Sequence, residues 1–203
     1  MKDPELPDRA VLALFDFDGT LTTKDSFMAF LLFTHGRVKL ALHFSYLWPA
    51  LLLYQLKILS NSKVKRLVVQ QLYKNWPVTF FREKASVFCR DALPALLNPE
   101  AMAKLEWHRQ QGHRVVVVTA MFEQVLETWC QAQNLELLAT RLETENGNLT
   151  GNFNTLNCYG TEKARRVKAA GLLAQNPLVF AYGDSEGDKA LLALADKPFY
   201  RCF

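Results

Sequence analysis

Two aspartates stand two residues apart at the end of an apolar run. Asp16 and Asp18 follow the run VLALF at residues 11–15, and Gly19 comes directly after them. Because side chains at i and i+2 of an extended segment point to the same side, we expect the two carboxylates to converge while Phe17 turns toward the core. Two carboxylates so close together cannot both ionise easily, so either one pKa rises or a cation lies between them. A Mg²⁺ ion would keep one aspartate ionised as a nucleophile, and the other would carry a proton for a leaving group. A metal-free turn is the alternative interpretation of this motif taken alone.

A second acidic group follows another apolar run, in the segment YGDSEGDKALL. Asp184 comes at the end of that run, and Asp188 lies four residues later. Magnesium prefers about six oxygen ligands, of which water supplies several. Asp16, Asp184 and a backbone carbonyl near Asp18 would supply the protein's share. The alternative for Ser185 and Asp188 is helix capping, which for Asp188 is compatible with a supporting role in the site.

Lys163 and Thr119 are the candidates for binding an anion. If Thr161 caps its helix, Lys163 falls in the first turn, where the helix dipole disfavours a cation unless an anion lies opposite it. The alternative is a solvated basic face, which is expected to cover Arg165 or Arg166. The hydroxyl of Thr119 and the amide of Ala120 are predicted to face the N-terminus of a new helix, which would make a phosphate site. A simple capping threonine is the alternative.

The elements that position these residues alternate between strand and helix. Apolar runs at 11–15, 114–120 and 177–184 are typical of buried parallel strands. Helices are predicted over 98–112, 121–134 and 161–171, the first with an Asn98 cap, proline at its first position and glycine past its end. This order predicts a doubly wound, Rossmann-like α/β sheet, whose ligands lie beyond the carboxyl ends of the strands. Asn146-Gly147 predicts a type I′ β-hairpin within residues 137–153.

One hundred residues, 19–118, separate Asp18 from Thr119. A crossover needs only about 12 residues, so a further unit is inserted there. It reads as helical throughout: a short helix ended by Gly36, a longer one interrupted by Pro49, and two more opened by Ser62 or Asn61 and by Thr79. We therefore expect a helical cap domain at residues 25–94 and an α/β catalytic core formed by residues 1–24 and 95–203.

The bulk composition sets wider bounds. The chain of 203 residues is 50% hydrophobic, which is enough for a proper core. Its net charge of +4 is too small to indicate a nucleic-acid partner. The four cysteines form no C-x-x-C pair and are interpreted as reduced, buried thiols. Residues 1–10 are polar and contain no apolar stretch, so a signal peptide is not expected and the cytoplasm is the predicted compartment.

Four segments resemble, in order, the four motifs of haloacid dehalogenase-like (HAD) hydrolases: DFDGTLT, VVVTA, GTEKARR and GDSEGD. The chain is similar to the phosphoserine-phosphatase-like branch (subfamily IB), which carries a helical cap between the first two motifs. The resemblance implies a Mg²⁺-dependent phosphatase that forms an aspartyl-phosphate intermediate. It implies the following roles: Asp16 as nucleophile, Asp18 as general acid and base, Thr119, Ala120 and Lys163 as phosphate ligands, Asp16, Asp18 and Asp184 as metal ligands, and Asp188 as support. Asp25 stands where phosphoserine phosphatases carry a substrate-reading glutamate, and this difference leaves serine phosphate in doubt.

The segment 40–56 is apolar nearly all round, so it is expected to be either buried or in contact with lipid. A buried cap helix kinked at Pro49 is the favoured interpretation. The alternative is peripheral contact with the inner face of a membrane, with Tyr46, Trp48 and Tyr54 as interfacial anchors.

The substrate is accordingly predicted to be a small phosphorylated metabolite or a lipid-linked phosphate, with a phosphatidylglycerophosphatase-like activity as one possibility. A phosphotransferase would use the same residues and is a competing hypothesis. A non-catalytic membrane- or partner-binding module is a third. The sequence leaves the oligomeric state open.

Overall fold

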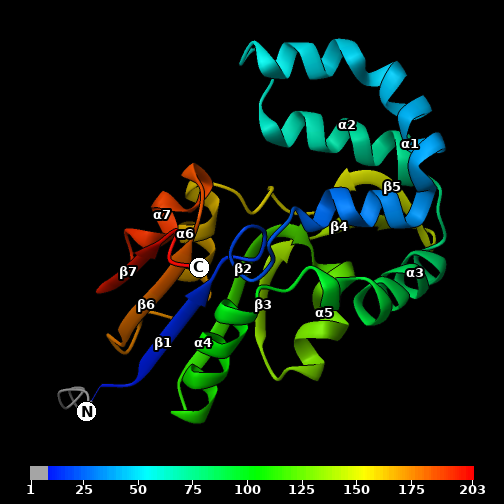
Figure 1. Ribbon diagram of the computed structural model, residues 1–203. Helices are drawn as coiled ribbons and strands as arrows, with labels where there is room; N and C mark the ends of the chain where they lie inside the picture. Colours follow the sequence, from blue (N-terminus) through cyan, green and yellow to red (C-terminus); the bar gives the residue numbers. More distant parts are fainter. Residues whose placement is uncertain (1–8) are drawn as a thin grey trace.

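Five parallel strands form the central sheet, in the order β3-β2-β1-β6-β7 (Figure 1). The strands are β1 (Val11–Phe15), β2 (Arg114–Phe122), β3 (Glu136–Thr140), β6 (Leu178–Gly183) and β7 (Lys197–Tyr200). The three strands predicted from apolar runs are β1, β2 and β6, and they lie side by side in the middle of the sheet. The computed structural model describes residues 9–203, so the expectation about a signal peptide falls largely outside the described residues.

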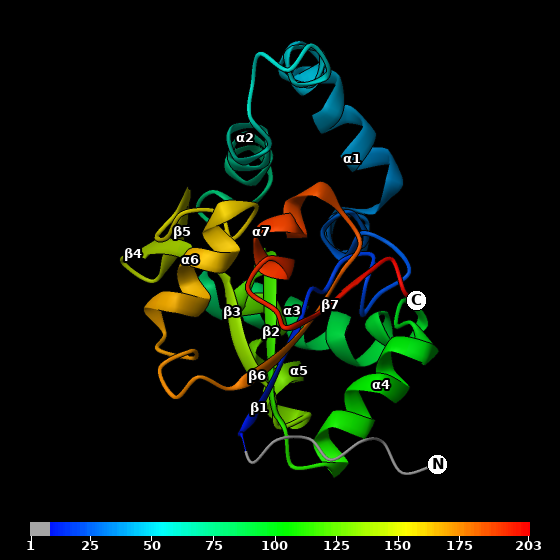
Figure 2. The same ribbon diagram turned by 90° about the vertical axis from the view of Figure 1, so that its left-hand side faces the viewer.

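Helices cover both faces of this sheet, as Figure 2 shows. Successive residues of β1 enter two separate cores, because side chains alternate along a strand. Phe15 packs in the core under α4 (Pro99–Gln110) and α5 (Glu123–Ala132). Leu14 packs in the core under α6 (Thr161–Ala169) and α7 (Lys189–Leu192). The predicted doubly wound α/β fold is therefore confirmed.

The predicted hairpin is present as a separate two-stranded sheet of β4 (Leu142–Glu145) and β5 (Asn148–Phe153). Asn146 and Gly147 both have positive φ, 49° and 78°, as a type I′ turn requires. The hairpin is shorter than the predicted range 137–153. Residues 136–140 instead join the central sheet as β3, next to β2.

The inserted segment is helical, with α1 (Ser26–Gln55), α2 (Asn61–Tyr73), α3 (Val78–Asp91) and the short 3₁₀ helix η1 (Leu93–Ala95). The predicted break at Gly36 is confirmed, because this residue has non-helical angles of φ 71° and ψ 166° within α1. Figure 1 shows α1 leaving the sheet, turning, and returning across α2 at the far end of the molecule.

Two predicted caps in this segment are wrong. The side chain of Ser60, not Ser62 or Asn61, accepts the hydrogen bond from the amide of Lys63 that caps α2. Pro77 holds the capping position of α3 in place of Thr79, and it makes no side-chain capping bond. Pro77 has no free N–H, which the first turn of a helix does not need.

The favoured interpretation of residues 40–56, a buried helix, is also wrong. Tyr46 and Trp48 are 76% and 61% exposed, and Leu42, Leu52 and Leu56 are exposed as well. Only one side of this half of α1 packs against the protein, so its all-round apolar pattern is not explained by burial. Within residues 9–203, no helix is long and apolar enough to cross a membrane.

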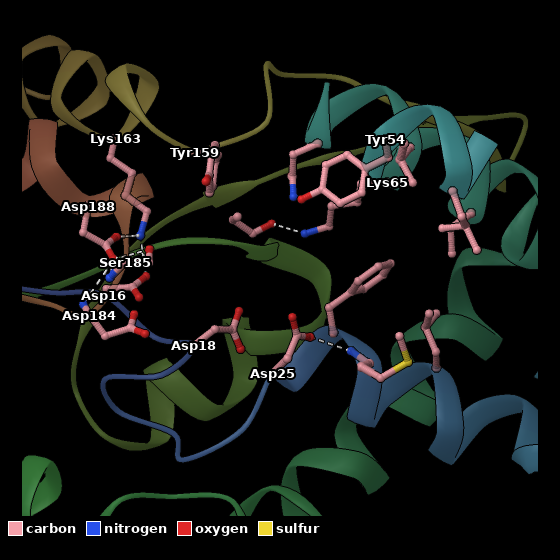
Figure 3. Close-up of a pocket in the computed structure, with 18 of the residues that line it drawn as sticks. Asp16, Asp18, Asp25, Tyr54, Lys65, Tyr159, Lys163, Asp184, Ser185 and Asp188 are labelled. Carbon is pink, nitrogen blue, oxygen red and sulfur yellow. Dashed lines mark hydrogen bonds and ion pairs between the residues drawn. The ribbon is translucent and has the colours of Figure 1, made fainter. Parts of the chain in front are cut away.

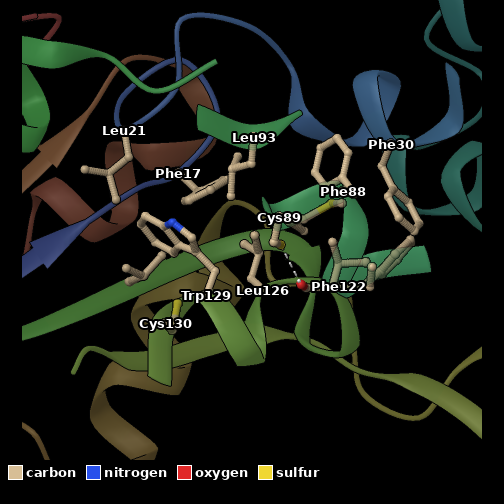
Figure 4. Close-up of a cluster of buried hydrophobic side chains, with 14 of the residues drawn as sticks. Phe17, Leu21, Phe30, Phe88, Cys89, Leu93, Phe122, Leu126, Trp129 and Cys130 are labelled. Atoms are coloured by element: carbon tan, nitrogen blue, oxygen red, sulfur yellow. Dashed lines mark hydrogen bonds between the residues drawn. The ribbon is translucent and has the colours of Figure 1, made fainter. Parts of the chain in front are cut away.

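A buried cluster fixes the loop that follows β1 (Figure 4). Phe17 is fully buried and packs edge to face against Trp129 of α5, with ring centroids 5.5 Å apart. Leu21 and Leu93 lie in the same cluster. Cys89, Cys130 and Cys158 are buried free thiols, as predicted, but the free thiol of Cys202 is exposed.

Candidate active site

Asp16 and Asp18 line one cavity at the carboxyl ends of β1 and β6 (Figure 3). Phe17, which lies between them in the chain, is fully buried in the hydrophobic core and does not line the cavity. The amide of Asp16 donates to the carbonyl of Tyr182 at 2.9 Å, so the backbone at Asp16 still pairs with β6. The predicted convergence of the two aspartates on one side of the chain is therefore seen. Burial raises the pKa of Asp16 to about 7, although the nearby Lys163 opposes this shift.

The carboxylate of Asp18 is held by the start of α1. Its Oδ1 accepts a hydrogen bond of 2.7 Å from the amide of Ser26. Burial raises the pKa of Asp18, and the bond from Ser26 opposes that rise. Asp25 caps the same helix, because its Oδ1 accepts from the amide of Met28 at 2.7 Å. Asp25 also lines the cavity, so one residue caps the helix and forms part of the cavity wall.

Lys163 lies at the centre of the acidic residues. It is 3% exposed, and its Nζ donates to Oδ1 of Asp16 and, at 2.6 Å, to Oδ1 of Asp188. Burial alone would lower the pKa of Lys163, but the two carboxylates raise it above its ordinary value, so the ammonium is charged. Lys163 is in the first turn of α6, as predicted. The residue at the capping position is Gly160, with φ 63° and ψ −131°, and not Thr161. A β-carbon does not tolerate that conformation well.

The loop after β6 contains Asp184, Ser185 and Asp188, with the last at the end of the 3₁₀ helix η2 (Glu186–Asp188). The predicted capping is confirmed, because Oδ2 of Asp188 accepts from the amide of Ser185 at 3.0 Å and from its hydroxyl at 2.7 Å. Both oxygens of Asp188 are thus engaged, one by Ser185 and one by Lys163. Although burial opposes it, Lys163 holds the pKa of Asp188 below its ordinary value.

The geometry around Asp184 fits a metal ion. Carboxylate oxygens of Asp16, Asp184 and Asp188 lie within 4.8 Å of one another. Oδ1 of Asp184 is buried and has no hydrogen-bond partner among the described residues. A buried polar atom without a partner is costly, and a hard cation would satisfy it. Gly19 makes room for this carboxylate, because a β-carbon at position 19 would lie 2.6 Å from Cγ of Asp184.

The surroundings of Thr119 differ from the prediction. No helix begins at Ala120, because β2 continues to Phe122 and α5 begins at Glu123. Oγ1 of Thr119 accepts from the amide of Met121 at 2.9 Å, which bends the strand at a point where its pairing with β3 shifts. Thr119 is fully buried, and Ala120 lines the cavity.

Lys65 is a cavity residue that the sequence interpretation missed. It comes from α2 and is buried, and its Nζ donates to the carbonyl of Ala120 at 2.7 Å. The ammonium also lies 4.6 Å and 4.8 Å from the ring centroids of Phe27 and Phe122. Burial lowers the pKa of Lys65 to about 8. The sequence does carry a signal, since Lys65 lies one helical turn before Val68 on the buried side of α2.

The cavity has a volume of about 350 Å³ and two distinct ends. Acidic residues and Lys163 form the end at the sheet, and the inserted helices form the other. That second end is mostly apolar, with walls made by Phe27, Leu31, Phe44, Leu51, Val64 and Val68. Tyr54 and Tyr159 also line it (Figure 3). A ligand that fills this space would place a polar group at the sheet and an apolar body under α1 and α2.

Comparison with known proteins gives consistent results. The sequence profile described as haloacid dehalogenase-like hydrolase matches residues 13–193. Protein CicA of Caulobacter vibrioides is 34% identical over 201 residues, which cover 98% of this chain and 89% of that protein. A Mycobacterium tuberculosis protein named "Probable phosphatase Rv3661" is 28% identical over 195 residues, covering 92% of this chain and 67% of the relative.

Among solved structures, a Bordetella pertussis protein of unknown function is 25% identical with a TM-score of 0.76, covering 92% of this chain and 87% of that one. A phosphoserine phosphatase with an analogue of its phospho-aspartyl intermediate is 20% identical with a TM-score of 0.63, covering 93% and 84% of the two chains. The second likeness supports the predicted fold.

Proposed function

The chain belongs to the haloacid dehalogenase-like hydrolases, and we propose that it is a magnesium-dependent phosphatase acting on phosphomonoesters. One observation carries this proposal. A buried aspartate, a charged lysine and an unpartnered carboxylate oxygen of Asp184 meet at one end of a single cavity. The M. tuberculosis relative named as a probable phosphatase supports the same conclusion.

Asp16 is the proposed nucleophile. Its carboxylate would attack phosphorus in line with the leaving oxygen and form an aspartyl-phosphate. Asp18 lies two residues away, and its pKa is raised by burial, which suits a group that must carry a proton. Asp18 would protonate the leaving alcohol and then take a proton from the water that hydrolyses the intermediate. The bond from Ser26 would hold the Asp18 carboxylate in place during both steps.

Magnesium would be held by Asp16, Asp184 and the backbone carbonyl of Asp18. When bound, the ion would offset negative charge on the phosphoryl oxygens. Asp188 is assigned a supporting role, because its two oxygens already bind Lys163 and Ser185. Ser185 in turn fixes the orientation of Asp188.

The phosphate ligands proposed are Lys163, Ala120 and Thr119. Lys163 already contacts Asp16 and would bind the phosphoryl oxygens that approach this carboxylate. Ala120 lines the cavity, and its backbone amide is the proposed donor. The Oγ1 atom of Thr119 accepts from Met121, so the hydroxyl proton of Thr119 remains to be donated.

The leaving alcohol would lie against residues 25–94, which we propose as a cap domain over the core formed by 1–24 and 95–203. Asp25 and Lys65 supply the charges on this side, and the rest of the wall is apolar. This wall favours an alcohol with an apolar body over a small polar metabolite. A lipid phosphatase acting at the cytoplasmic membrane face is therefore the second candidate function. The free cysteines are consistent with a reducing compartment.

Phosphate release from an aryl phosphate, with Mg²⁺ and with the metal chelated, tests the proposal. We expect activity only with Mg²⁺, and a loss of at least a thousandfold in Asp16→Asn. Asp91→Asn is the matched control, since this exposed acid lies outside the cavity. Full activity of Asp16→Asn, or of the metal-free protein, would contradict the mechanism.

Two further assays separate the competing functions. A panel of phosphorylated metabolites and phospholipids compares the small-molecule and lipid substrates. Added acceptor alcohols detect a phosphotransferase, because they would speed turnover and yield new phosphoesters. A non-catalytic binding module would cleave none of these compounds and would still bind vesicles.

A further inference from the structure

The half of α1 that follows Gly36 exposes an unusual amount of apolar surface. The described residues include 17 large hydrophobic side chains that are exposed, and nine of them lie within residues 38–58. We define the outer face of α1 by the exposed large hydrophobic side chains of residues 38–56 that do not line the cavity, with Leu56 as the residue that caps the helix: Val38, Leu42, Tyr46, Trp48, Leu52, Leu53 and Leu56. A helix with one face in water is normally polar on that face.

The cavity does not account for this surface. Phe44, Leu51 and Tyr54 line the cavity, and Leu40 is buried. These residues belong to the opposite, inner face of the same helix. Figure 1 shows that α2 lies between this half of α1 and the sheet, so the outer face points away from the rest of the described chain. A contiguous exposed apolar surface of this kind marks an interaction site.

The charge around this surface has one sign. Residues 26–82 contain eight of the chain's 24 basic residues and none of its 20 acidic residues. This segment therefore carries +8, while the rest of the chain carries −4. The basic residues are Arg37, Lys39, Lys57, Lys63, Lys65, Arg66, Lys74 and Arg82. Arg37, Lys39 and Lys57 stand at the two ends of the outer face and are exposed. The complementary partner is an anionic surface.

We propose that the outer face of α1 docks on an anionic lipid bilayer. The helix would lie in the plane of the interface, with Tyr46 and Trp48 at the level of the headgroups and the leucines against the acyl chains. The flanking cations would contact anionic headgroups. Binding to a protein with an apolar groove does not depend on the absence of acidic residues from a segment of 57 residues. Binding to an anionic bilayer surface is favoured by that absence.

Docking of this kind would also position the cavity. The inner face of α1 forms the cavity wall, so the membrane surface and the binding site would be separated by the thickness of one helix. An apolar alcohol bearing a phosphate could then be drawn from the bilayer. This consequence rests on the proposed phosphatase function, but the docking itself does not.

Vesicle co-sedimentation measures the docking directly. The full chain is mixed with vesicles of phosphatidylcholine containing about a third phosphatidylglycerol, and with vesicles of phosphatidylcholine alone. We expect strong binding to the anionic vesicles that weakens with added salt. Leu42→Ser/Trp48→Ser/Leu56→Ser should abolish binding. Leu156→Ser/Tyr200→Ser is the matched control, because these exposed residues lie on the other part of the chain.

The charge contribution is tested with Lys39→Gln/Lys57→Gln. We expect affinity for anionic vesicles to fall about fivefold per lysine, from the attraction of one cation to an anionic surface. Lys168→Gln/Lys197→Gln removes the same charge from the core and should leave the affinity unchanged. Circular dichroism confirms that each variant is folded.

Three outcomes overturn the inference: failure of the wild-type chain to bind anionic vesicles, wild-type affinity in the triple serine variant, and equal effects of the two lysine pairs. A further contrary outcome is a dimer that the serine variant converts to a monomer without any vesicle binding, because the face would then serve a second copy. Asp16→Asn should bind vesicles like the wild type, so that failure of docking and failure of the catalytic proposal are distinguishable.

Discussion

Gly19 gives the sharpest test of how the acidic residues are brought together. Its φ is +80°, and a β-carbon there would lie 2.6 Å from Cγ of Asp184. Alanine at this position therefore has two effects. The left-handed backbone is unfavourable for any residue with a β-carbon, and the carboxylate of Asp184 must shift from its present position.

The two effects have different magnitudes and different signatures. The backbone effect should lower the free energy of unfolding by about 1–2 kcal/mol. The displacement of Asp184 should remove the metal site. At a Mg²⁺ concentration of about 100 times its dissociation constant, binding stabilises the folded wild-type protein by about 2.7 kcal/mol. Gly19→Ala should gain almost none of that stabilisation, and its phosphatase activity should fall by at least a hundredfold.

Gly112→Ala is the matched control. Gly112 also has a positive φ of +71°, but a β-carbon there meets nothing within 4 Å. This variant should lose the same ~1–2 kcal/mol and keep its full response to Mg²⁺. Urea denaturation of the three proteins, with and without Mg²⁺, measures both quantities. If Gly19→Ala responds to Mg²⁺ as the wild type does, Asp184 is not a metal ligand and the argument from its unpartnered oxygen fails.

Two further predictions concern Lys65 and His108. Lys65→Met should lower kcat/KM about tenfold for substrates whose leaving alcohol carries an anion, because one charged hydrogen bond is lost, and should change aryl phosphate hydrolysis less than about twofold. The control variant Lys63→Met, at an exposed neighbouring residue, should change neither rate. Equal effects of Lys65→Met on both kinds of substrate would exclude a role in recognition. Burial lowers the pKa of His108 to about 3, with His113 and Lys104 contributing, so the folded protein keeps this ring neutral while the unfolded chain protonates it below about pH 6.5. The contribution of His108 to stability should therefore fall by about 1.4 kcal/mol between about pH 7.5 and pH 5.5. Urea denaturation of the wild type and His108→Gln should show their difference in unfolding free energy changing by that amount, and a difference that does not change with pH would be evidence against this source.

The middle of the fold could be predicted because its signals are local. Four consecutive valines in β2 and the short apolar run of β1 indicate strands that are buried on both faces. The edge strands lack that signal. β7 is largely exposed and contains Pro198. The sequence pattern of β3 does not distinguish it from the hairpin, because the extended residues continue past Thr140. The tertiary contact that separates β3 from β4, from the amide of Arg141 to Thr155, is not visible in a linear pattern.

The candidate site divides in the same way. The positions of Asp16, Asp18 and Asp184 follow from strand ends and could be predicted, as could the capping of η2 by Ser185 and Asp188. Details that depend on actual backbone angles could not. Gly160, and not Thr161, holds the capping position of α6 with a positive φ, and the sequence alone does not specify that backbone conformation. The role of Lys65 depends on which helix of the inserted segment crosses the cavity, and a linear pattern does not contain that information.

Both halves of α1 contact the same cavity, because the helix turns at Gly36. Its first residue, Ser26, binds the carboxylate of Asp18, and Tyr54 near its end lines the same cavity. A straight helix would place residues 26 and 54 about 40 Å apart, far more than the cavity can span. The left-handed conformation of Gly36 turns the second half back over the site, so that its inner face closes the cavity. The outer face is then necessarily directed away from the protein. Because one turn in the backbone directs both faces, the apolar cavity wall and the apolar exposed surface are two sides of one helix, which supports the proposal of a substrate with an apolar body.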